Sequence, residues 1–163
     1  MLHLYLIRHA DAVPRGDPNF ADDDRPLTEK GKQQSQALGR TLTGHGLKFD
    51  VILCSPLPRA QETLEGLLES LEAKPPVEYC PELRPGGKAK KLDREIVKHP
   101  GGSIALVGHE PDLGEYAARL IGSKKASIAL AKGGVACVAC TDPPGKRCGS
   151  LTWMITPEWF EKS

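Results

Sequence analysis

The sequence predicts an α/β protein of three layers, α/β/α, in which helices cover both faces of a mostly parallel central sheet. Two apolar runs, Leu2 to Ile7 and Ile104 to Val107, are nearly continuous in hydrophobicity, as in strands covered on both faces. Segments with helical spacing of apolar residues alternate with such runs, and that alternation is typical of parallel sheets. The 163 residues contain no long linker, so we expect a single domain over 1–163.

The first third of the chain predicts a loop, a helix and a second strand. Residues 13–26 are rich in Asp, Pro, Gly and Asn, which indicates a loop. A helix is predicted from 27–29 to about residue 44 or 46, with Thr28 as its N-cap. The apolar segment 50–55 is expected to form the second strand of the sheet.

The middle of the chain predicts a buried helix and a surface helix. Ser55 is expected to cap a helix with two prolines in its first turn, which packs through to about residue 73. A short strand is predicted over 77–79, between prolines. Residues 88–99 are weakly apolar and charged, which is typical of a helix on the surface.

The last third predicts one more buried strand, a helix and an antiparallel edge. The strand at 104–107 is followed by a helix that begins at Pro111. Three further strands are expected at 128–130, 135–141 and 149–155. The final two are joined through 142–145, whose Asp-Pro-Pro-Gly sequence predicts an antiparallel edge hairpin.

Composition excludes several classes of partner. Lys and Arg number 22 against 21 Asp and Glu, aromatic residues are few and no basic block occurs, so we expect neither nucleic-acid nor membrane binding. The apolar start has no basic residues before it and is interrupted by Arg8, so we expect a cytoplasmic protein rather than a secreted one. Cys137 and Cys140 are separated by an odd number of positions in a predicted strand, so their side chains point to opposite faces of the sheet. We therefore expect buried thiols, with no metal and no cofactor.

Polar side chains follow the predicted strands at the points where those strands end. Arg8 and His9 follow the first strand, Arg59 lies in the first turn after the second, and His109 follows the strand at 104–107. Because the carboxyl ends of parallel strands meet at one edge of a sheet, these four side chains should line one crevice. A purely structural alternative is that Arg59 pairs with a glutamate of its own helix.

Arg25 has two open interpretations. It lies in the loop that leaves the crevice, so its side chain could bend back onto a bound anion. Equally, it could be a solvated arginine that pairs with the acidic residues Asp22, Asp23 and Asp24.

Arginines and histidines gathered in one crevice suit a phosphoryl group. That group carries about two negative charges near neutrality, and its in-line transfer depends on cations that hold the equatorial oxygens. A histidine with an ordinary pKa of about 6.5 can present a neutral ring nitrogen at pH 7, so one histidine can attack phosphorus while another donates a hydrogen bond.

Three motifs together resemble the histidine phosphatase superfamily. They are LIRHADA at residues 6–12, SPLPRAQET at 55–63 and LVGHEP at 106–111. The chain is similar over nearly its whole length to the phosphoglycerate mutase-like fold of that superfamily. Its compact size and the RPLT segment at 25–28 are most similar to the SixA-like phosphohistidine phosphatases.

The resemblance implies roles for the candidate residues. His9 would be the catalytic nucleophile that becomes phosphohistidine, and Arg8, Arg59 and His109 would bind the phosphate, with Arg25 as a further contact. Water would then release the phosphate. The third residue of the usual Arg-His-Gly motif is Ala10 here, which is a small change.

A second departure bears on the substrate. Many relatives carry an acid that protonates the leaving oxygen, and Pro85 stands at that place in ELRPGGK. An alkoxide needs such help, whereas imidazole, whose conjugate acid has a pKa of about 6.5, needs little. The missing acid favours phosphohistidine as substrate. Substitutes that the sequence leaves open are Asp11, an acid among Asp22 to Asp24, Glu82 and Glu110.

The short chain has few residues for a lid, so we expect an open crevice that can admit a histidine of another protein. The sequence thus predicts a phosphohistidine phosphatase that acts on a protein. The expected partner is a phosphohistidine-containing signalling protein. One alternative is a small-molecule phosphomonoesterase or phosphoglycerate mutase-like enzyme on the same fold. A second is a phosphate-binding module without catalysis.

Overall fold

The computed structural model describes residues 1–141 and 143–160, which build one six-stranded sheet in the order β3-β2-β4-β1-β5-β6. The first four strands in sequence run parallel to one another. Strand β5 is antiparallel to β1, and β6 is antiparallel to β5 at the edge. The predicted, mostly parallel sheet with an antiparallel edge hairpin is confirmed. The strands are β1 (Leu2–Arg8), β2 (Val51–Cys54), β3 (Val77–Tyr79), β4 (Ser103–Gly108), β5 (Val135–Cys140) and β6 (Gly149–Ile155).

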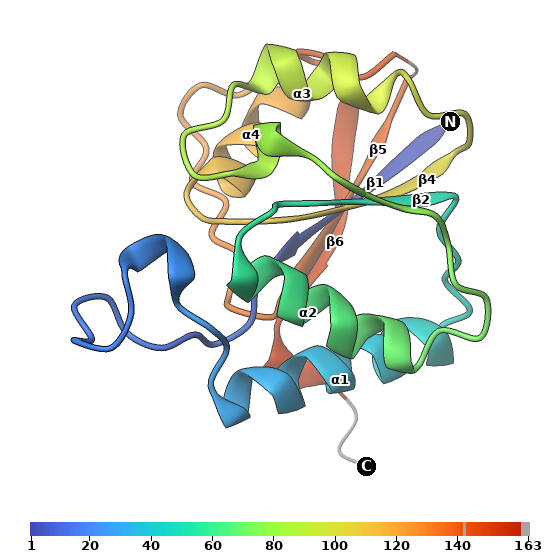
Figure 1. The fold of residues 1–163 in the computed structure, drawn as a ribbon. Coiled ribbons are helices and arrows are strands. Elements are labelled where there is room, and N and C mark those ends of the chain that lie inside the picture. The colour runs from blue at the N-terminus through green and yellow to red at the C-terminus, as the bar shows by residue number, and fades with distance from the viewer. Residues whose placement is uncertain (142, 161–163) are drawn as a thin grey trace.

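Helices cover both faces of this sheet, which confirms the three predicted layers (Figure 1). One face packs against α1 (Glu29–Gly44) and α2 (Pro58–Glu69), and the other against α3 (Ala89–Ile96) and α4 (Asp112–Leu120). Short 3-10 turns are η1 (Asp22–Asp24), η2 (Pro81–Leu83) and η3 (Pro157–Trp159). Because successive residues of a strand point to opposite faces, the sheet contributes to two apolar clusters, one on each side.

The start of α1 confirms the predicted cap. The Oγ1 atom of Thr28 accepts a hydrogen bond from the N–H of Gly31 at 3.1 Å. Gly31 also allows the helix to approach the end of β1 closely, since a Cβ atom there would lie 2.0 Å from the carbonyl oxygen of Asp11. The first turn of α1 is therefore fixed against the segment that follows β1.

The start and end of α2 differ from the prediction. The helix begins at Pro58 with Leu57 as its N-cap and ends at Glu69, before residue 73. Ser55 is not its cap, because the two residues that follow it are not helical and its Oγ lies instead beside the ring of His109. The surface helix α3 is also shorter than the predicted 88–99.

The prediction of a strand at 128–130 is wrong. Residues 128–130 form no strand and pair with no strand of the sheet. The carbonyl oxygen of Leu130 accepts a hydrogen bond from Nη1 of Arg8 at 2.9 Å instead, so this backbone supports a side chain rather than a ladder. In the predicted turn at 142–145, Asp142 lies outside the described residues.

The cysteines occupy the positions that strand geometry predicts. Cys137 belongs to the apolar cluster under α1 and α2, whereas Cys140 belongs to the cluster under α3 and α4. All five cysteines have free thiols. Within 1–141 and 143–160, no helix is long and apolar enough to cross a bilayer, and no group of three or more His, Cys, Asp or Glu side chains could hold a metal ion.

Candidate active site

The ends of three neighbouring strands bring the candidate residues together. Strand β4 lies between β1 and β2, with Arg8 opposite Gly108 and Cys54 opposite Val107. The residues that follow these strands therefore emerge at the same edge of the sheet. The imidazole rings of His9 and His109 lie with their centroids 5.2 Å apart.

A cavity of about 460 Å³ opens at this edge. All five residues singled out in the sequence line it: Arg8, His9, Arg25, Arg59 and His109. Its wall also contains Pro85, at the place where many relatives of the predicted family carry an acid. The loop at 13–26, which projects from the body of the molecule, supplies further wall residues (Figure 1).

His9 is held in a defined tautomer. Its Nδ1 lies 2.7 Å from the carbonyl oxygen of Ala10. A carbonyl can only accept, so Nδ1 carries the proton and Nε2 keeps its lone pair. Burial, together with the positive charges of Arg59 and Arg8 and against the opposing effect of the Ala10 carbonyl, lowers the pKa of His9 to about 4. The ring is therefore neutral near pH 7.

The backbone of Ala10 is fixed in turn by α2. Its N–H donates to Oγ1 of Thr63 at 2.9 Å, and the Thr63 hydroxyl donates to the carbonyl oxygen of Arg59 at 2.7 Å. This chain of bonds connects the residue after His9 with the first turn of the helix that carries Arg59. It positions the imidazole and the guanidinium relative to each other.

His109 is oriented by Ser55. Its Nε2 lies 2.8 Å from the Oγ of Ser55, which also accepts a bond from the N–H of Leu57 at 3.3 Å. The hydroxyl can therefore donate to Nε2, and Nδ1 then carries the proton of this ring. Burial, followed by the proximity of His9 and Arg59, lowers the pKa of His109 to about 3. Near neutral pH this ring is an uncharged hydrogen-bond donor.

Three buried side-chain nitrogen atoms in the described part of the chain have no hydrogen-bond partner, and all three belong to this site. They are Nε of Arg8, Nε of Arg59 and Nδ1 of His109. Arg59 is only 1% exposed. Burial lowers the pKa of both guanidinium groups, yet an arginine remains charged at neutral pH. Unpaired buried donors of this kind fit an anion bound between them.

Arg25 pairs with an acidic residue of its own loop, as one interpretation expected, but it is buried rather than solvated. Its Nε pairs with Oδ1 of Asp22 at 3.0 Å and its Nη1 donates to the carbonyl oxygen of Val13 at 2.8 Å. It nevertheless lines the cavity and is 7% exposed. Arg59 does not pair with Glu62, whose carboxylate accepts from the N–H of Leu27 at 2.9 Å.

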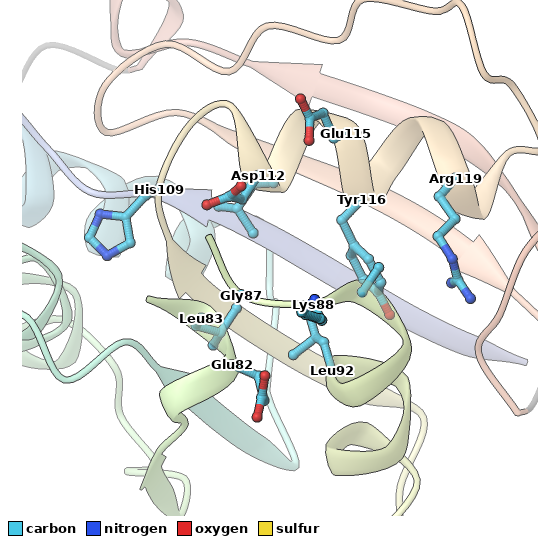
Figure 2. Close-up of a pocket in the computed structure, with 12 residues that line it drawn as sticks. Glu82, Leu83, Gly87, Lys88, Leu92, His109, Asp112, Glu115, Tyr116 and Arg119 are labelled. Atoms are coloured by element: carbon cyan, nitrogen blue, oxygen red, sulfur yellow. The ribbon is translucent and has the colours of Figure 1, made fainter. Parts of the chain in front are cut away.

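The acidic residues divide between two cavities. Asp11 and Glu110 line the cavity that contains His9. Glu82 lies in a neighbouring cavity of about 280 Å³, which shares only His109 with the first (Figure 2). Figure 2 shows Glu82 with Asp112 and Glu115 around that second cavity. Asp22 is engaged by Arg25.

Asp11 and Glu110 differ as proton donors. The hydrogen bond from Thr28 and the proximity of Lys132 hold the pKa of Asp11 below its usual range. Burial raises the pKa of Glu110, although one of its oxygens accepts from the N–H of Gly114 at 2.7 Å. Of the two, Glu110 is the better candidate for a carboxyl group that keeps a proton.

Sequence reasoning missed two basic residues of the cavity, Arg15 and Lys132. Arg15 lies in the exposed loop and pairs with Asp22 at 3.5 Å. Lys132 follows the segment that was wrongly predicted as a strand. The two glycines after Lys132 were the available signal, because they allow that backbone to lie close to the end of β1.

The fold and the cavity define an α/β protein that gathers buried cations and neutral histidines around a place for an oxyanion. Residues 4–89 match the sequence profile of the histidine phosphatase superfamily, branch 1. The chain belongs to this superfamily, and it is a phosphatase. The family and enzyme class predicted from the motifs are thereby confirmed.

The chain is also similar to individual proteins. The chain is 34% identical to an uncharacterized protein of Picosynechococcus, over 98% of this chain and 99% of that protein. It is 38% identical to the mitochondrial serine/threonine-protein phosphatase Pgam5 of Drosophila yakuba, over 52% of this chain and only 28% of that protein. The fold is similar to that of the protein histidine phosphatase SixA in complex with tungstate, with a TM-score of 0.82, 24% identity and coverage of 96% and 97% of the two chains.

Proposed function

We propose that this protein is a phosphohistidine phosphatase, which removes phosphate from a phosphorylated histidine of another protein through a covalent intermediate on His9. The observation that supports this most strongly is the set of three buried, unpartnered nitrogen atoms of Arg8, Arg59 and His109 around the cavity. A phosphoryl group has the oxygen atoms and the charge to satisfy all three.

In the first step, the lone pair on Nε2 of His9 attacks phosphorus. An N–P bond forms as the bond between phosphorus and the leaving imidazole breaks, and the electron pair of that bond stays on the leaving nitrogen. The other ring nitrogen of the substrate histidine carries a proton, so the group leaves as neutral imidazole. The bond from Nδ1 to Ala10 stabilises the positive charge that His9 gains. The guanidinium groups of Arg8 and Arg59 and the Nδ1–H of His109 are placed to stabilise the equatorial oxygens.

In the second step, water attacks the phosphoenzyme. A new O–P bond forms, the N–P bond breaks and its electron pair returns to Nε2 of His9. The attacking oxygen becomes part of inorganic phosphate, and the proton that the water gives up passes to the surrounding water. The same cations stabilise this second in-line transition state. No metal or other cofactor is needed in either step.

The identity of the leaving group supports phosphohistidine. Pro85 lines the cavity where a proton donor would assist an alkoxide, and Asp11 is held ionised by its bonds. Imidazole leaves with little protonation, because its conjugate acid has a pKa of about 6.5. The likeness of the fold to the protein histidine phosphatase SixA supports the same substrate class.

We also propose a phosphohistidine-containing signalling protein in the cytoplasm as the partner, and a single catalytic domain over 1–163. Four of the five free cysteines are buried, which suits a reducing compartment. Strands from both ends of the chain, β1 and β5–β6, pair in one sheet, which supports one domain.

The second candidate is a phosphomonoesterase for small molecules. It is favoured by Glu110, which lines the cavity and whose carboxyl group has a raised pKa, so that it could protonate an alkoxide. Rates of phosphate release from a phosphohistidine protein, a phosphotyrosine peptide and sugar phosphates separate the two functions. The proposal expects the highest kcat/KM on the phosphohistidine protein.

The nucleophile is tested by His9→Ala. We expect this variant to lose phosphate release and to form no acid-labile phosphoenzyme from a 32P-labelled substrate, while the wild type does both. Retained turnover in His9→Ala would refute the mechanism. A wild-type protein that binds phosphate but never becomes labelled would identify a binding module.

A further inference from the structure

Lys132 lies in a segment that is bonded directly to the end of β1. The N–H of Gly133 donates to the carbonyl oxygens of Arg8 at 3.2 Å and of His9 at 3.1 Å, and the N–H of Arg8 donates to the carbonyl oxygen of Gly134 at 3.2 Å. These backbone bonds hold Lys132 beside His9. Its side chain lines the same cavity.

The charge of Lys132 remains available to a ligand. Its Nζ lies 3.3 Å from Oδ1 of Asp11, whose other oxygen accepts a short bond from the Thr28 hydroxyl at 2.6 Å. The Lys132 side chain is 47% exposed, and ion pairs in such positions contribute little to stability. Asp11 therefore orients the ammonium group at the cavity, and an incoming anion can compete for it.

The phosphoryl group itself does not require this lysine. Arg59 and Arg25 are 1% and 7% exposed, and half-buried Arg8 lies with them in the cavity. Arg25 is paired with Asp22, and the charges of Arg8 and Arg59 together match the charge of about two that a phosphoryl group brings. Lys132 is more exposed than these three arginines, and its backbone is held beside His9, whereas Arg15 lies in the projecting loop and pairs with Asp22. Lys132 therefore faces the part of a substrate that remains outside the phosphate pocket.

We propose that Lys132 is a specificity-determining residue, which binds the carboxylate of an aspartate or glutamate next to the phosphorylated residue of the protein substrate. This inference rests on the proposed function, because it takes the substrate to be a polypeptide. The contact is an exposed charge pair, so its effect should be modest and should weaken as salt is added.

The test uses two phosphohistidine peptides that differ only by Glu or Gln beside the phosphohistidine. We expect the wild type to prefer the Glu peptide by roughly two- to five-fold in kcat/KM, mainly through KM. Lys132→Gln should remove this preference, and Lys132→Glu should reverse it. At about 1 M salt, where the Debye length is near 3 Å, the wild-type preference should disappear.

Two controls separate specificity from general damage. Lys124→Gln removes an exposed lysine that lines neither cavity, and its preference should equal that of the wild type. On p-nitrophenyl phosphate, which has no second anion, Lys132→Gln should change kcat/KM by the same factor as on the Gln peptide, and by less than on the Glu peptide. A preference that survives in Lys132→Gln, or an equal loss on both peptides and on p-nitrophenyl phosphate, would overturn the inference.

Failure of the proposed function gives a different result. In that case the wild type would hydrolyse p-nitrophenyl phosphate but neither phosphohistidine peptide. The same Glu and Gln pair made with phosphoserine then tests Lys132 by itself: a Glu preference that depends on Lys132 supports its role, and its absence overturns it.

Discussion

The Oγ of Ser55 lies 2.8 Å from Nε2 of His109, so a residue at the end of β2 determines which ring nitrogen of His109 is free to face the cavity. Ser55 is fully buried and lies next to no solvent that could replace the bond. We therefore propose that Ser55 is a positioning residue, which acts on the proposed phosphate site through the imidazole.

Ser55→Ala should therefore lower phosphate release while leaving the fold intact. Loss of one partner of a buried hydrogen bond costs about 1–3 kcal/mol, so we expect roughly a ten-fold or greater fall in kcat. Ser35→Ala is the matched control, because Ser35 is buried in α1 and bonds only the carbonyl of Lys32. It should lower the midpoint of urea unfolding without changing kcat, and equal kcat losses in both variants would contradict the role of Ser55.

Arg59→Met should separate activity from stability. The wild-type guanidinium is buried with its Nε unpartnered, so an apolar side chain of similar length should leave the free energy of unfolding unchanged or raise it. Removal of a donor to the transition state should lower kcat by roughly 10²- to 10³-fold. Urea unfolding with and without inorganic phosphate checks both: phosphate should stabilise the wild type and not the variant.

Stability should fall with pH in a range set by the two histidines. Their pKa values are lowered to about 4 for His9 and about 3 for His109, whereas the unfolded chain binds these protons near pH 6.5. Between about pH 4 and pH 6.5, the unfolded state therefore binds more protons than the folded state. The contribution of the two neutral histidines to the free energy of unfolding is complete above pH 6.5. It is lost as the pH falls towards 4, by up to about 1.4 kcal/mol per pH unit for each histidine.

Urea unfolding at several pH values between 6.5 and 4.5 measures this slope. His9→Asn should lower the slope of the free energy of unfolding against pH by about the contribution of one histidine. His45→Asn removes an exposed histidine instead and should leave the slope as in the wild type. Identical slopes in all three proteins would contradict the linkage.

Two glycines of α1 should respond oppositely to alanine. At Gly31 the new Cβ would lie 2.0 Å from the backbone oxygen of Asp11, which cannot yield without shifting the segment after β1. Gly31→Ala should therefore destabilise the protein by about 1–3 kcal/mol and reduce activity. Gly44→Ala meets no atom within 4 Å and should stabilise it by about 0.5–1 kcal/mol, because alanine favours the helix. Thermal or urea unfolding of both variants measures the difference.

The sheet and the strand ends could be predicted because their signals are local. Apolar runs marked β1 and β4, and Thr28 marked the start of α1. The role of Ser55 could not be predicted, since a serine before prolines is equally suited to cap a helix, and its actual partner is 54 positions away. The position of Lys132 could not be predicted for the same reason. The residues on either side of it, Leu130 and Gly133, bond to Arg8 and His9 far away in the sequence, and no local pattern indicates these partners.

The position of β4 between β1 and β2 has a consequence for biosynthesis. Until residues 103–108 leave the ribosome, the two earlier strands have no common neighbour, and each keeps an unpaired backbone edge. The arrival of β4 closes this gap and delivers His109 at the same moment. A nascent chain that stalls before that point would be prone to aggregate, and it would lack a working phosphate pocket.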